Sequence, residues 1–510
     1  VITEFPFWSF LFADLHSHVI SIPFTLMTLC LILNLILSNA SGVRPIDRVP
    51  TAIMIAFSIG ALAGINTWDV PTYGVIALGG GIILMATMSR TFTRKRLVTF
   101  LASIVGLGLA AYLFFLPFHL HYDSNFDGLK LSPERTSIWN YLAIHGLMLF
   151  LISSWIVKEF VVKFKRSLPT SEGPDARSST SFASLSWIVF FVLAATSAIA
   201  ISIPLALTTV AAISILLLFT ITLAVRLLSH GNRHETRIQL FLLLLIGTAL
   251  LTSAAVDLVS LENDIGRMNT VFKSYIQVWV LMALASGIIL WLFIANHSPS
   301  PVRRERFLTR TWVVAIIFLA IGSLVFPVLG TQARLADRFQ PLPLTLDGSQ
   351  YQYAASYQDP GPDKLSGALP SSYPLAFDRN ALQYMQKHII GSPVVLEAVT
   401  DQYRWTPRVA SYTGLPVVMG WEWHQTQQRG PTVRHRMGDV DTMYSTVDKD
   451  LLLRLLDKYA VEYVYVGPVE NLYYPRQGLA KFRALVGSRL EIFYESESVT
   501  IYKLVDSRSP

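Results

Sequence analysis

The chain has 510 residues, of which 52% are hydrophobic and 15% are charged, and its mean hydropathy is +0.46. This composition is typical of a membrane protein. The net charge is +7, but the polar part of the chain has no basic patch with interleaved aromatic residues, which argues against nucleic acid as a partner. The one cysteine, Cys30, excludes a disulfide framework and a thiolate metal site.

Ten apolar segments have a length that suits a bilayer, which takes about 20 mostly apolar residues to cross. They are 19–37, 51–66, 72–88, 98–117, 140–157, 185–203, 205–225, 239–256, 274–294 and 311–329. The stretch 51–88 is interpreted as two short helices, because Asn66-Thr-Trp-Asp69-Val-Pro71 interrupts it. We therefore predict an α-helical polytopic membrane protein with about ten transmembrane helices in residues 1–330.

Lysine and arginine alternate between the loops that join these segments. One set of loops, at 38–50, 89–97, 158–184, 226–238 and 295–310, holds 18 of them, and the opposite set holds four. Cytoplasmic loops carry the excess of Lys and Arg, so the first set is predicted to lie inside a cell membrane. The polar motifs and the tail after residue 330 are then predicted to lie outside.

The tail has the composition of an ordinary globular domain. Residues 331–375 are predicted to be a linker, and 376–510 to be an extracytoplasmic α/β domain. Helices are expected at 378–387, 449–459 and 479–485, and strands at 393–399, 461–466 and in a hairpin across 490–504. Helices that alternate with strands favour a small α/β sandwich.

The first polar motif is Asp14-Leu-His16-Ser-His18, directly before the first apolar segment. Ionisable residues beside a bilayer are costly to bury and are often functional. We predict a catalytic role for Asp14, and a divalent metal site at Asp14, His16 and His18 with an incomplete ligand set. The alternative is interfacial anchoring with solvated histidines.

The second polar motif, 257–273, carries acidic residues and then the two cations of its loop. Glu262 and Asp264 are candidate catalytic acids. Arg267 and Lys273, with His16, are candidate ligands of a donor phosphate, since arginine pairs phosphate oxygens bidentately and lysine acts as a point charge. The alternative is an acidic–basic network that ties helix ends together. A carboxylate at the Asn66–Asp69 turn is explained by helix capping as well as by catalysis.

The tail contains one further motif, from Gly420 to Gly430, in which paired tryptophans stand beside ionisable residues. Its sequence suits a polar ligand whose C–H faces stack on indole, with buried aromatic packing as the alternative. The candidate acceptor-binding residues are Trp421, Glu422, His424 and Arg429.

These stretches resemble the "YYY" family, which consists of uncharacterised polytopic membrane proteins with a domain of unknown function. The family is grouped with the GT-C superfamily of integral-membrane glycosyltransferases. The resemblance rests on 4–18, Asn66-Thr-Trp-Asp69, Arg267-Met-Asn-Thr-Val-Phe-Lys273, 420–430 and Val461-Glu-Tyr-Val-Tyr-Val-Gly-Pro468. Ser17, where the family pattern has proline, departs from it, and so does the loop 422–428.

The resemblance implies a GT-C-like fold and further N-terminal spans, so the chain is expected to be truncated before Val1. It also implies that the main catalytic carboxylate lies in that earlier part, with Asp14 as a second acidic element. A membrane glycosyltransferase would transfer a sugar from a polyprenyl-phosphate donor to a glycan, lipid or protein acceptor on the outer membrane face.

Two other functions stay open. A non-catalytic, membrane-anchored binding or assembly protein would use the tail as a binding module. A lipid or solute transporter is less favoured, because the spans are largely apolar and the polar groups gather at one membrane face.

Overall fold

The protein is described by a computed structural model, which covers residues 5–13, 16–38, 44–88, 93–122, 128–165, 207–230, 234–262, 266–295, 302–338, 342–361 and 371–505. The chain divides into two compact units, Val1–Ala333 and Arg334–Pro510. We call them the membrane unit and the C-terminal domain, and each is described by itself.

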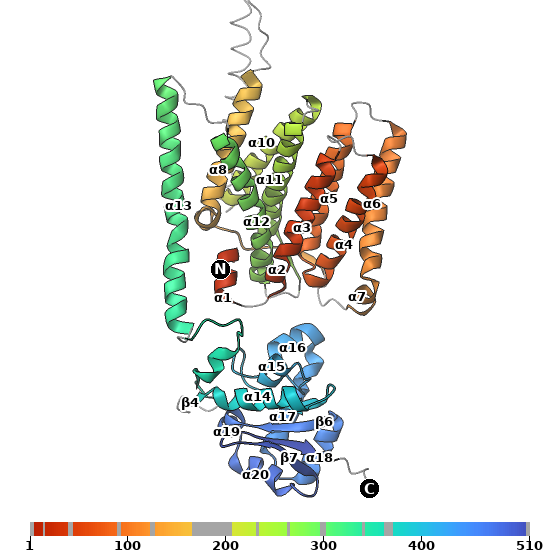
Figure 1. Cartoon of the computed structure of the whole chain (residues 1–510), viewed down its shortest axis with the longest axis vertical. Coiled ribbons are helices and arrows are strands. Elements are labelled where there is room, and N and C mark those ends of the chain that lie inside the picture. Colours follow the sequence, from red (N-terminus) through yellow and green to blue (C-terminus); the bar gives the residue numbers. More distant parts are fainter. Residues whose placement is uncertain are drawn as a thin grey trace, which may run out of the picture. The chain divides into compact units, whose positions relative to one another are not determined.

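Nine helices in the described ranges are long and apolar enough to cross a membrane. They are α3 (Ile22–Leu37), α4 (Val49–Ile65), α5 (Asp69–Met88), α6 (Arg94–Phe114), α8 (Ile138–Lys165), α10 (Thr208–His230), α11 (His234–Leu258), α12 (Gly266–Ala295) and α13 (Arg303–Arg338). The long helices run side by side (Figure 1). The prediction of a polytopic helical membrane protein is confirmed. The predicted span 185–203 lies outside the described residues.

The break predicted inside 51–88 separates α4 from α5. Asn66 ends α4 with an extended backbone, φ −152° and ψ 93°, which the helix cannot continue. The Asp69 N–H then donates to the carbonyl of Asn66 at 2.9 Å, and Asp69 opens α5. A carboxylate in the first helical turn complements the positive end of the helix dipole.

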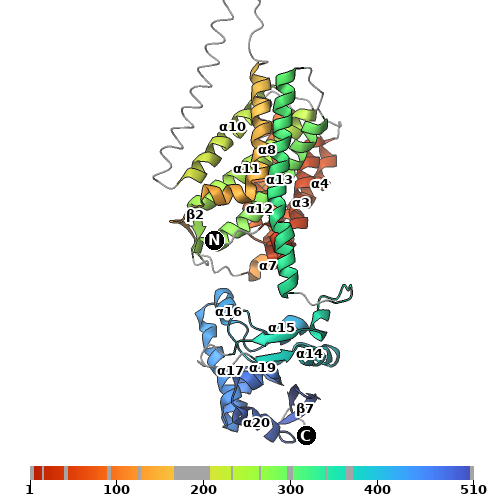
Figure 2. The ribbon, with the colours of Figure 1, turned by 90° about the vertical axis from the view of Figure 1, so that its left-hand side faces the viewer.

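Packing is uneven across the membrane unit. The core runs along α11 and α12, where Leu242, Ile246, Leu281 and Ala285 are buried. Helix α13 lies at the left edge of the unit in Figure 1 and in front of the other helices in Figure 2, and no residue in the window of α13 that suits a membrane span is buried. Trp312 fixes it by donating from Nε1 to the Ser154 hydroxyl at 3.0 Å. Lipid is the natural cover for such an apolar surface.

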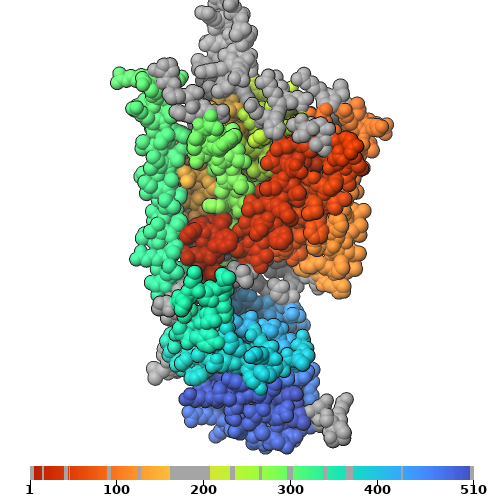
Figure 3. All heavy atoms as spheres, viewed as in Figure 1, coloured from red at the N-terminus to blue at the C-terminus, as the bar shows by residue number. Residues whose placement is uncertain are grey.

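Short elements occupy the loops of the membrane unit. They are α1 (Pro6–Phe12), α2 (Ser17–Ile20), η1 (Pro45–Arg48), α7 (Leu116–His121), β1 (Leu129–Leu131) and β2 (Val259–Leu261). Strands β1 and β2 pair antiparallel and join loops that are about 130 residues apart in sequence. The space-filling view shows α1 and α3 (red) and α12 (green) on one face (Figure 3).

The alternation of basic and acidic loops becomes a separation between two ends of the membrane unit. At one end, Arg48 and Arg237 lie close enough to interact electrostatically. At the other end, the His18 ring lies edge-on to Phe272, with 5.4 Å between ring centres. The motif around His18 and the motif at the start of α12 therefore meet in the membrane unit.

The C-terminal domain has a four-stranded sheet in the order β5-β6-β8-β7, in which β5 and β6 are parallel and the other pairs antiparallel. Its elements are η2 (Gln350–Tyr353), β3 (Ser356–Asp359), β4 (Ser371–Pro374), α14 (Ala376–His388), β5 (Val394–Leu396), α15 (Arg408–Thr413), α16 (Glu422–Arg429), η3 (Pro431–Arg434), α17 (His435–Ser445), α18 (Lys449–Lys458), β6 (Val461–Val466), α19 (Pro468–Tyr473), α20 (Arg476–Ala484), β7 (Leu490–Glu495) and β8 (Thr500–Leu504). The predicted α/β class is confirmed.

The segment predicted as a linker, 331–375, is structured in several places. It holds the end of α13, η2 and the antiparallel pair β3–β4. Tyr373 is buried and belongs to the same hydrophobic core as Val464 of β6. The division of the chain after Ala333 places all of this segment but its first three residues with the C-terminal domain.

Candidate functional site

Three polar segments that are far apart in sequence meet at one end of the membrane unit. The His18 ring contacts Phe272 of α12, as described above. The Lys273 ammonium lies 5.3 Å from the centre of the Trp68 ring, and Gln277 Nε2 donates to the Trp68 carbonyl at 3.1 Å. The segment before α3, the α4–α5 turn and the start of α12 thus form one site. We call its polar side chains the polar end cluster: His18, Ser21, Asn66, Asp69, Lys273 and Gln277.

Asp69 is the buried acid of the polar end cluster. Its exposed fraction is 1%, and its carboxyl group lies beside the side chains of Ser21 and Asn66 and close to His18. Within the described part of the chain, its Oδ2 has no hydrogen-bond partner. A buried carboxylate with an unpaired oxygen is costly, so its presence in a membrane protein points to function.

His18 and His16 lie next to each other in front of α3. The two rings are edge to face with 5.2 Å between centres. His18 is buried and His16 is exposed. Asp14, the predicted catalytic acid and metal ligand, lies outside the described residues.

No three His, Cys, Asp or Glu side chains in the described ranges lie close enough together to share a metal ion. His16 and His18 are two of the three predicted ligands, and Asp14, the third, is not among the residues described. The divalent metal site at these three positions stays a prediction.

Lys273 supplies a positive charge to the polar end cluster. Its ammonium lies over the faces of Trp68 and Phe272, at 5.3 and 6.0 Å from the ring centres. Its carbonyl accepts a hydrogen bond from Gln277 Nε2 at 3.3 Å. Contacts of this kind with aromatic faces orient an ammonium group. This arrangement suits an anionic ligand.

Arg267 is held in a buried network. Its guanidinium forms an ion pair with Asp257, and both side chains are almost fully buried. It also donates to Thr136 Oγ1 at 2.6 Å and to the carbonyl of Val256 at 3.3 Å, and Asp257 Oδ1 accepts from the Thr136 N–H at 2.7 Å. These contacts join the start of α12 to the end of α11 and the segment before α8. They form the kind of network that the sequence offered as the alternative, and the role of Arg267 at a phosphate stays a prediction.

The other predicted acids of this loop are Glu262 and Asp264. Glu262 is exposed and follows β2, where its N–H donates to the Gly128 carbonyl at 2.9 Å. Asp264 lies outside the described residues. Glu262 thus belongs to the β1–β2 connection, and its catalytic role stays a prediction.

In the C-terminal domain, two of the four predicted acceptor-binding residues come together around Tyr403. The Tyr403 ring lies 5.1 Å from Trp421 and 5.6 Å from His424, measured between ring centres. Glu422 forms an ion pair with Arg434 at 2.6 Å. Arg429 donates from Nε to the side-chain oxygen of Gln425 at 3.2 Å. Trp421 and His424 therefore form an aromatic group with Tyr403. Glu422 and Arg429 instead bind Arg434 and Gln425.

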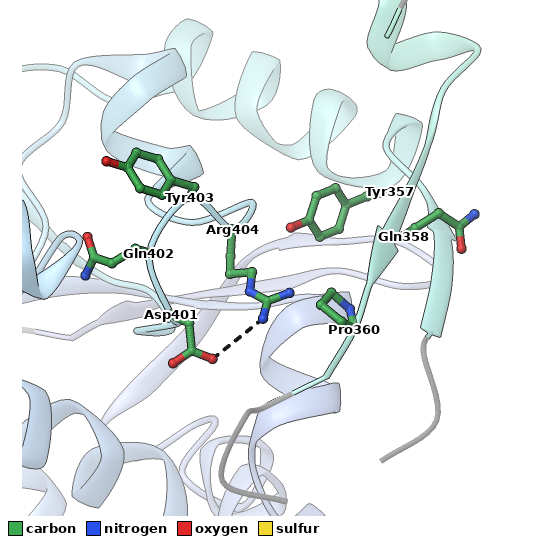
Figure 4. Close-up of a pocket in the computed structure, with 7 residues that line it drawn as sticks. All are labelled: Tyr357, Gln358, Pro360, Asp401, Gln402, Tyr403 and Arg404. Atoms are coloured by element: carbon green, nitrogen blue, oxygen red, sulfur yellow. Dashed lines mark ion pairs between the residues drawn. The ribbon is translucent and has the colours of Figure 1, made fainter. Parts of the chain in front are cut away.

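Tyr403 also lines a pocket of about 600 Å³ (Figure 4). One wall is the loop after β5 and the other is the end of β3, and Arg404 points from the loop toward Tyr357 and Pro360. The lining residues are Tyr357, Gln358, Pro360, Asp401, Gln402, Tyr403 and Arg404. Amides, a carboxylate, a guanidinium and phenol rings suit a polar ligand with C–H faces. The sequence analysis missed this pocket, because its two walls are about 45 residues apart and carry no motif.

Elsewhere in the C-terminal domain, Arg408 lies at the centre of a buried charge network. Arg408 contacts Asp378 at 3.1 Å, Glu397 at 3.6 Å and Glu470 at 2.6 Å, and all four side chains are fully buried. Burial lowers the pKa of Arg408, but the three carboxylates raise it further, so its pKa lies well above the usual value. Burial raises the pKa of Glu397 to about 7, against the opposing effect of Arg408.

The membrane unit also contains a residue that the sequence analysis undervalued. The Asp69 carboxylate was explained equally well by helix capping. One signal in the sequence could have singled it out. The alternation of loops rich and poor in Lys and Arg predicts that Asp69 lies on the same side of the membrane as Asp14 and Lys273. Ser21 and Gln277 carry no motif, and only their contacts reveal them.

Comparison with known proteins gives a family for the chain. The sequence model of a family described as "Uncharacterized membrane protein (DUF2298)" matches residues 1–282, from the N-terminus into α12. None of the curated proteins compared with the chain matches it.

Among solved structures, the chain is similar to the archaeal oligosaccharyltransferase AglB from Archaeoglobus fulgidus, in complex with an inhibitory peptide and a dolichol-phosphate. The sequence identity is 11% and the TM-score is 0.33, and the similarity covers 97% of this chain and 58% of that one. The chain thus spans a little over half the length of that transferase.

The family match covers more than half of the chain, and the polytopic helical fold agrees with it. The prediction of an uncharacterised membrane protein family is confirmed. The chain belongs to the DUF2298 family of membrane proteins.

Proposed function

We propose that this protein is a membrane glycosyltransferase, which transfers a sugar from a polyprenyl-phosphate donor to a glycan, lipid or protein acceptor at the outer face of the cell membrane. The observation that carries the proposal is the polar end cluster. It holds a buried carboxylate, Asp69, and a cation, Lys273, at the end of the membrane unit opposite the basic loops. A reaction that removes a proton and releases a phosphate needs both kinds of group.

In the proposed reaction, a carboxylate takes the proton of the acceptor hydroxyl while its oxygen attacks the anomeric carbon of the sugar. The bond from that carbon to the phosphate oxygen breaks, and the lipid phosphate leaves with the additional negative charge. Lys273 and His16 stabilise this developing charge. Such electrostatic stabilisation lowers the activation barrier more in a site shielded from water than in bulk water. Asp14 and Asp69 are the proposed acidic pair, and Glu262 and Asp264 are further acids on the loop before α12.

Arg267 has a positioning role in this proposal. Its ion pair with Asp257 and its bond to Thr136 fix the first turn of α12. Lys273 extends from the second turn of the same helix, so the network sets where its ammonium lies. A divalent ion held by Asp14, His16 and His18 would add positive charge near the phosphate, and no step above depends on it.

The proposal places the C-terminal domain outside the cell. Two observations support this side. Arg48 and Arg237, from two of the loops rich in Lys and Arg, lie close together, and loops of this composition are cytoplasmic. In addition, Phe326 near the end of α13 packs on Phe5 of the N-terminal segment, with 5.2 Å between ring centres, so the chain leaves the membrane unit from that end.

The acceptor is proposed to bind the C-terminal domain. Trp421 and His424 form its aromatic surface together with Tyr403, which also lines the polar pocket. Glu422 and Arg429 lie on the same helix, α16, and supply polar contacts at its ends. A sugar or peptide would use the aromatic rings for its C–H faces and the amides of the pocket for its polar groups.

The test uses the full chain in nanodiscs with radiolabelled polyprenyl-phosphate sugars and a membrane extract as the acceptor source. Release of free polyprenyl phosphate is measured for the wild type, Asp14→Asn, Asp69→Asn and Lys273→Met. We expect release from the wild type and its loss in all three variants. Asp47→Asn is the control, because Asp47 is exposed and bonded to Arg44 near the basic end.

A second function, that of a non-catalytic binding or assembly protein, is favoured by the pocket of the C-terminal domain, which can hold a ligand without any reaction. The same experiment separates the two. Well-folded wild-type protein that releases no polyprenyl phosphate from any donor, but retains glycans on an array through Trp421, would establish the binding protein and reject the transferase.

A further inference from the structure

Tyr403 joins the polar pocket of the C-terminal domain to the aromatic group that it forms with Trp421 and His424. It lines the pocket, and its ring also contacts the rings of Trp421 and His424. The Tyr403 side chain is 70% exposed. An aromatic ring is therefore presented to solvent at the point where the pocket and the aromatic group meet.

The backbone of Tyr403 is strained. Its φ is +60°, in the left-handed region that residues with a side chain seldom adopt and that costs them free energy. A glycine would adopt the same conformation freely, so folding alone gives no reason for an exposed tyrosine here. Strain of this kind gathers at ligand sites, where it fixes the direction of a side chain. In Figure 4, Tyr403 and Arg404 extend in opposite directions from the loop after β5.

The loop that carries Tyr403 is bonded to helix α16. With its amide oriented to match its neighbours, the Gln402 side-chain oxygen accepts from the N–H groups of Glu422 and Trp423 at 3.2 and 3.0 Å. These residues open α16, where backbone N–H groups have no partner inside the helix. His424 Nε2 lies 3.4 Å from the Tyr403 hydroxyl. The pocket and the aromatic group are thus held at a fixed spacing.

The other side chains of the pocket bring hydrogen-bond donors and acceptors together (Figure 4). Arg404 lies 3.9 Å from Asp401, and it is close enough to Tyr357 on the opposite wall to interact electrostatically. Gln358 and Gln402 add side-chain amides. Two neighbouring sugar hydroxyls can donate to the carboxylate and accept from the guanidinium while the ion pair stays in place.

The charge and the composition of the lining favour one of the three proposed acceptor classes. Asp401 and Arg404 carry opposite charges, so the lining as a whole is neutral and suits an uncharged ligand. Pro360 is the one aliphatic side chain among the described residues that line the pocket, which disfavours the hydrocarbon chain of a lipid. A neutral sugar has hydroxyls for the polar side chains and C–H faces for the aromatic rings.

We propose that the pocket and the aromatic group are adjoining subsites for two consecutive sugar units of a neutral glycan. The first unit places its hydroxyls against Asp401, Arg404 and the amides of the pocket. The second unit lays a C–H face on Trp421, and Tyr403 lies between the two. This inference rests on the proposed function, because it chooses the glycan among the proposed acceptors. Binding itself involves no transfer and is measured without a donor.

The experiment measures equilibrium binding to the full chain in phosphatidylcholine nanodiscs by titration calorimetry, with no lipid-linked sugar present. The probes are glucose, galactose and mannose, a disaccharide of each, and a pentapeptide of glycine and serine. We expect at least one of the three sugars to bind. Its disaccharide should bind roughly two- to tenfold more tightly, which is the contribution of one aromatic contact. The peptide should not bind.

Three variants test the two subsites. Trp421→Ala should bind the monosaccharide like the wild type and lose the additional affinity for the disaccharide. Gln358→Ala, at an exposed position, should weaken the binding of both sugars by roughly two- to tenfold, since it removes a hydrogen bond in the pocket. Gln477→Ala is its control, because Gln477 is an exposed glutamine on α20, and it should bind both sugars like the wild type.

Tyr403→Gly separates a role in binding from a role in folding. It should weaken disaccharide binding by about tenfold or more, since it removes the ring between the subsites. The midpoint of thermal unfolding should not fall, because glycine adopts the left-handed backbone without strain. A purely structural tyrosine would give the reverse result, with lower stability and unchanged binding.

Binding of the peptide but of none of the sugars would overturn the proposal, and so would a folded wild type that binds no probe. Disaccharide affinity that Trp421→Ala and Tyr403→Gly leave unchanged would also overturn it. Failure of the proposed function has a different signature: the sugars bind with the expected losses in the variants, while no polyprenyl phosphate is released from any donor. Conversely, release by a wild type that binds no sugar would reject the two subsites alone.

Discussion

Asp69 in the membrane unit and Asp378 in the C-terminal domain are both buried carboxylates in the first turn of a helix, and they are held in opposite ways. Asp378 Oδ1 accepts from Arg408 Nε at 3.1 Å and from the Tyr465 hydroxyl at 2.6 Å, and its Oδ2 accepts from Trp405 Nε1 at 2.7 Å. Asp69 Oδ2 has no such partner in the described chain.

From this difference we predict a structural role for Asp378 and a catalytic role for Asp69. Buried polar groups in proteins are nearly always hydrogen-bonded, so the full set of bonds at Asp378 is what folding alone requires. Asp69 Oδ2 finds no such partner among the described residues, and in the proposed reaction it would receive the proton of the acceptor. We therefore expect substitutions at the two sites to change different quantities: stability in the C-terminal domain and turnover in the membrane unit.

The largest effect is expected from Arg408→Met. This change leaves Asp378, Glu397 and Glu470 buried without their common cation, and breaking a buried ion pair costs about 3–5 kcal/mol. Limited proteolysis of the full chain should show rapid cleavage after residue 334 while the membrane unit stays intact. In the control Arg483→Met, which removes an exposed pair with Glu495, the cleavage pattern should not change. Protection equal to that of the wild type in Arg408→Met would show that the network is dispensable.

Asp69→Asn is expected to lower the rate of sugar transfer by roughly 10²–10⁴-fold, the usual contribution of a positioned general base. The asparagine has nearly the same volume and carries no buried charge, so the free energy of unfolding should not fall. Turnover and thermal unfolding are measured on the same nanodisc sample.

Asp378→Asn is the matched variant for this comparison. It should lose stability by about 1–3 kcal/mol, since it weakens charged hydrogen bonds, and it should retain turnover in whatever fraction stays folded. If Asp69→Asn lost stability and kept its rate, the two carboxylates would have the same structural role.

The pH dependence of the C-terminal domain gives a smaller effect. The pKa of Glu397 is about 7 in the folded protein and about 4.5 as its ordinary value. The folded state therefore keeps a proton that the unfolded state releases, so stability falls as the pH rises from about 4.5 to 7 and is constant above that range. The loss is at most about 3 kcal/mol.

Glu397→Gln should remove this dependence and be the more stable protein at pH 8. Hydrogen exchange in β5 and β6 of the full chain is compared between wild type and variant at pH 5 and pH 8. A constant ratio of the two exchange rates across this range would contradict the assignment.

The smallest expected effect concerns the acceptor. Trp421→Ala removes one ring from the group around Tyr403 and should raise the acceptor KM by roughly two- to tenfold, the range expected for one aromatic contact. The rate of donor hydrolysis without acceptor should stay the same. Trp423→Ala is the control, because Trp423 is exposed. An equal change in both variants would reject the aromatic group as the acceptor surface.

Those elements whose signals are local could be predicted from the amino-acid sequence. The interruption at Asn66–Asp69 ends one helix and begins another, as predicted, because the extended residue and the acidic cap are adjacent in the chain. The strand 461–466 has the predicted bounds, and the helix predicted at 449–459 ends one residue earlier. Apolar periodicity and the charge of a loop are properties of residues that are neighbours in the chain, so they can be recognised without knowledge of the fold.

Which polar residues share a site depends on contacts between segments that are far apart in the chain. Trp68 and Gln277 are bonded across 209 positions, and Arg408 binds Asp378 and Glu470 across 30 and 62 positions. Two cationic residues within two turns of one helix have different surroundings: Arg267 forms a buried ion pair, and Lys273 contacts aromatic rings. Burial and pairing depend on which distant segments pack together, and no local pattern encodes that choice.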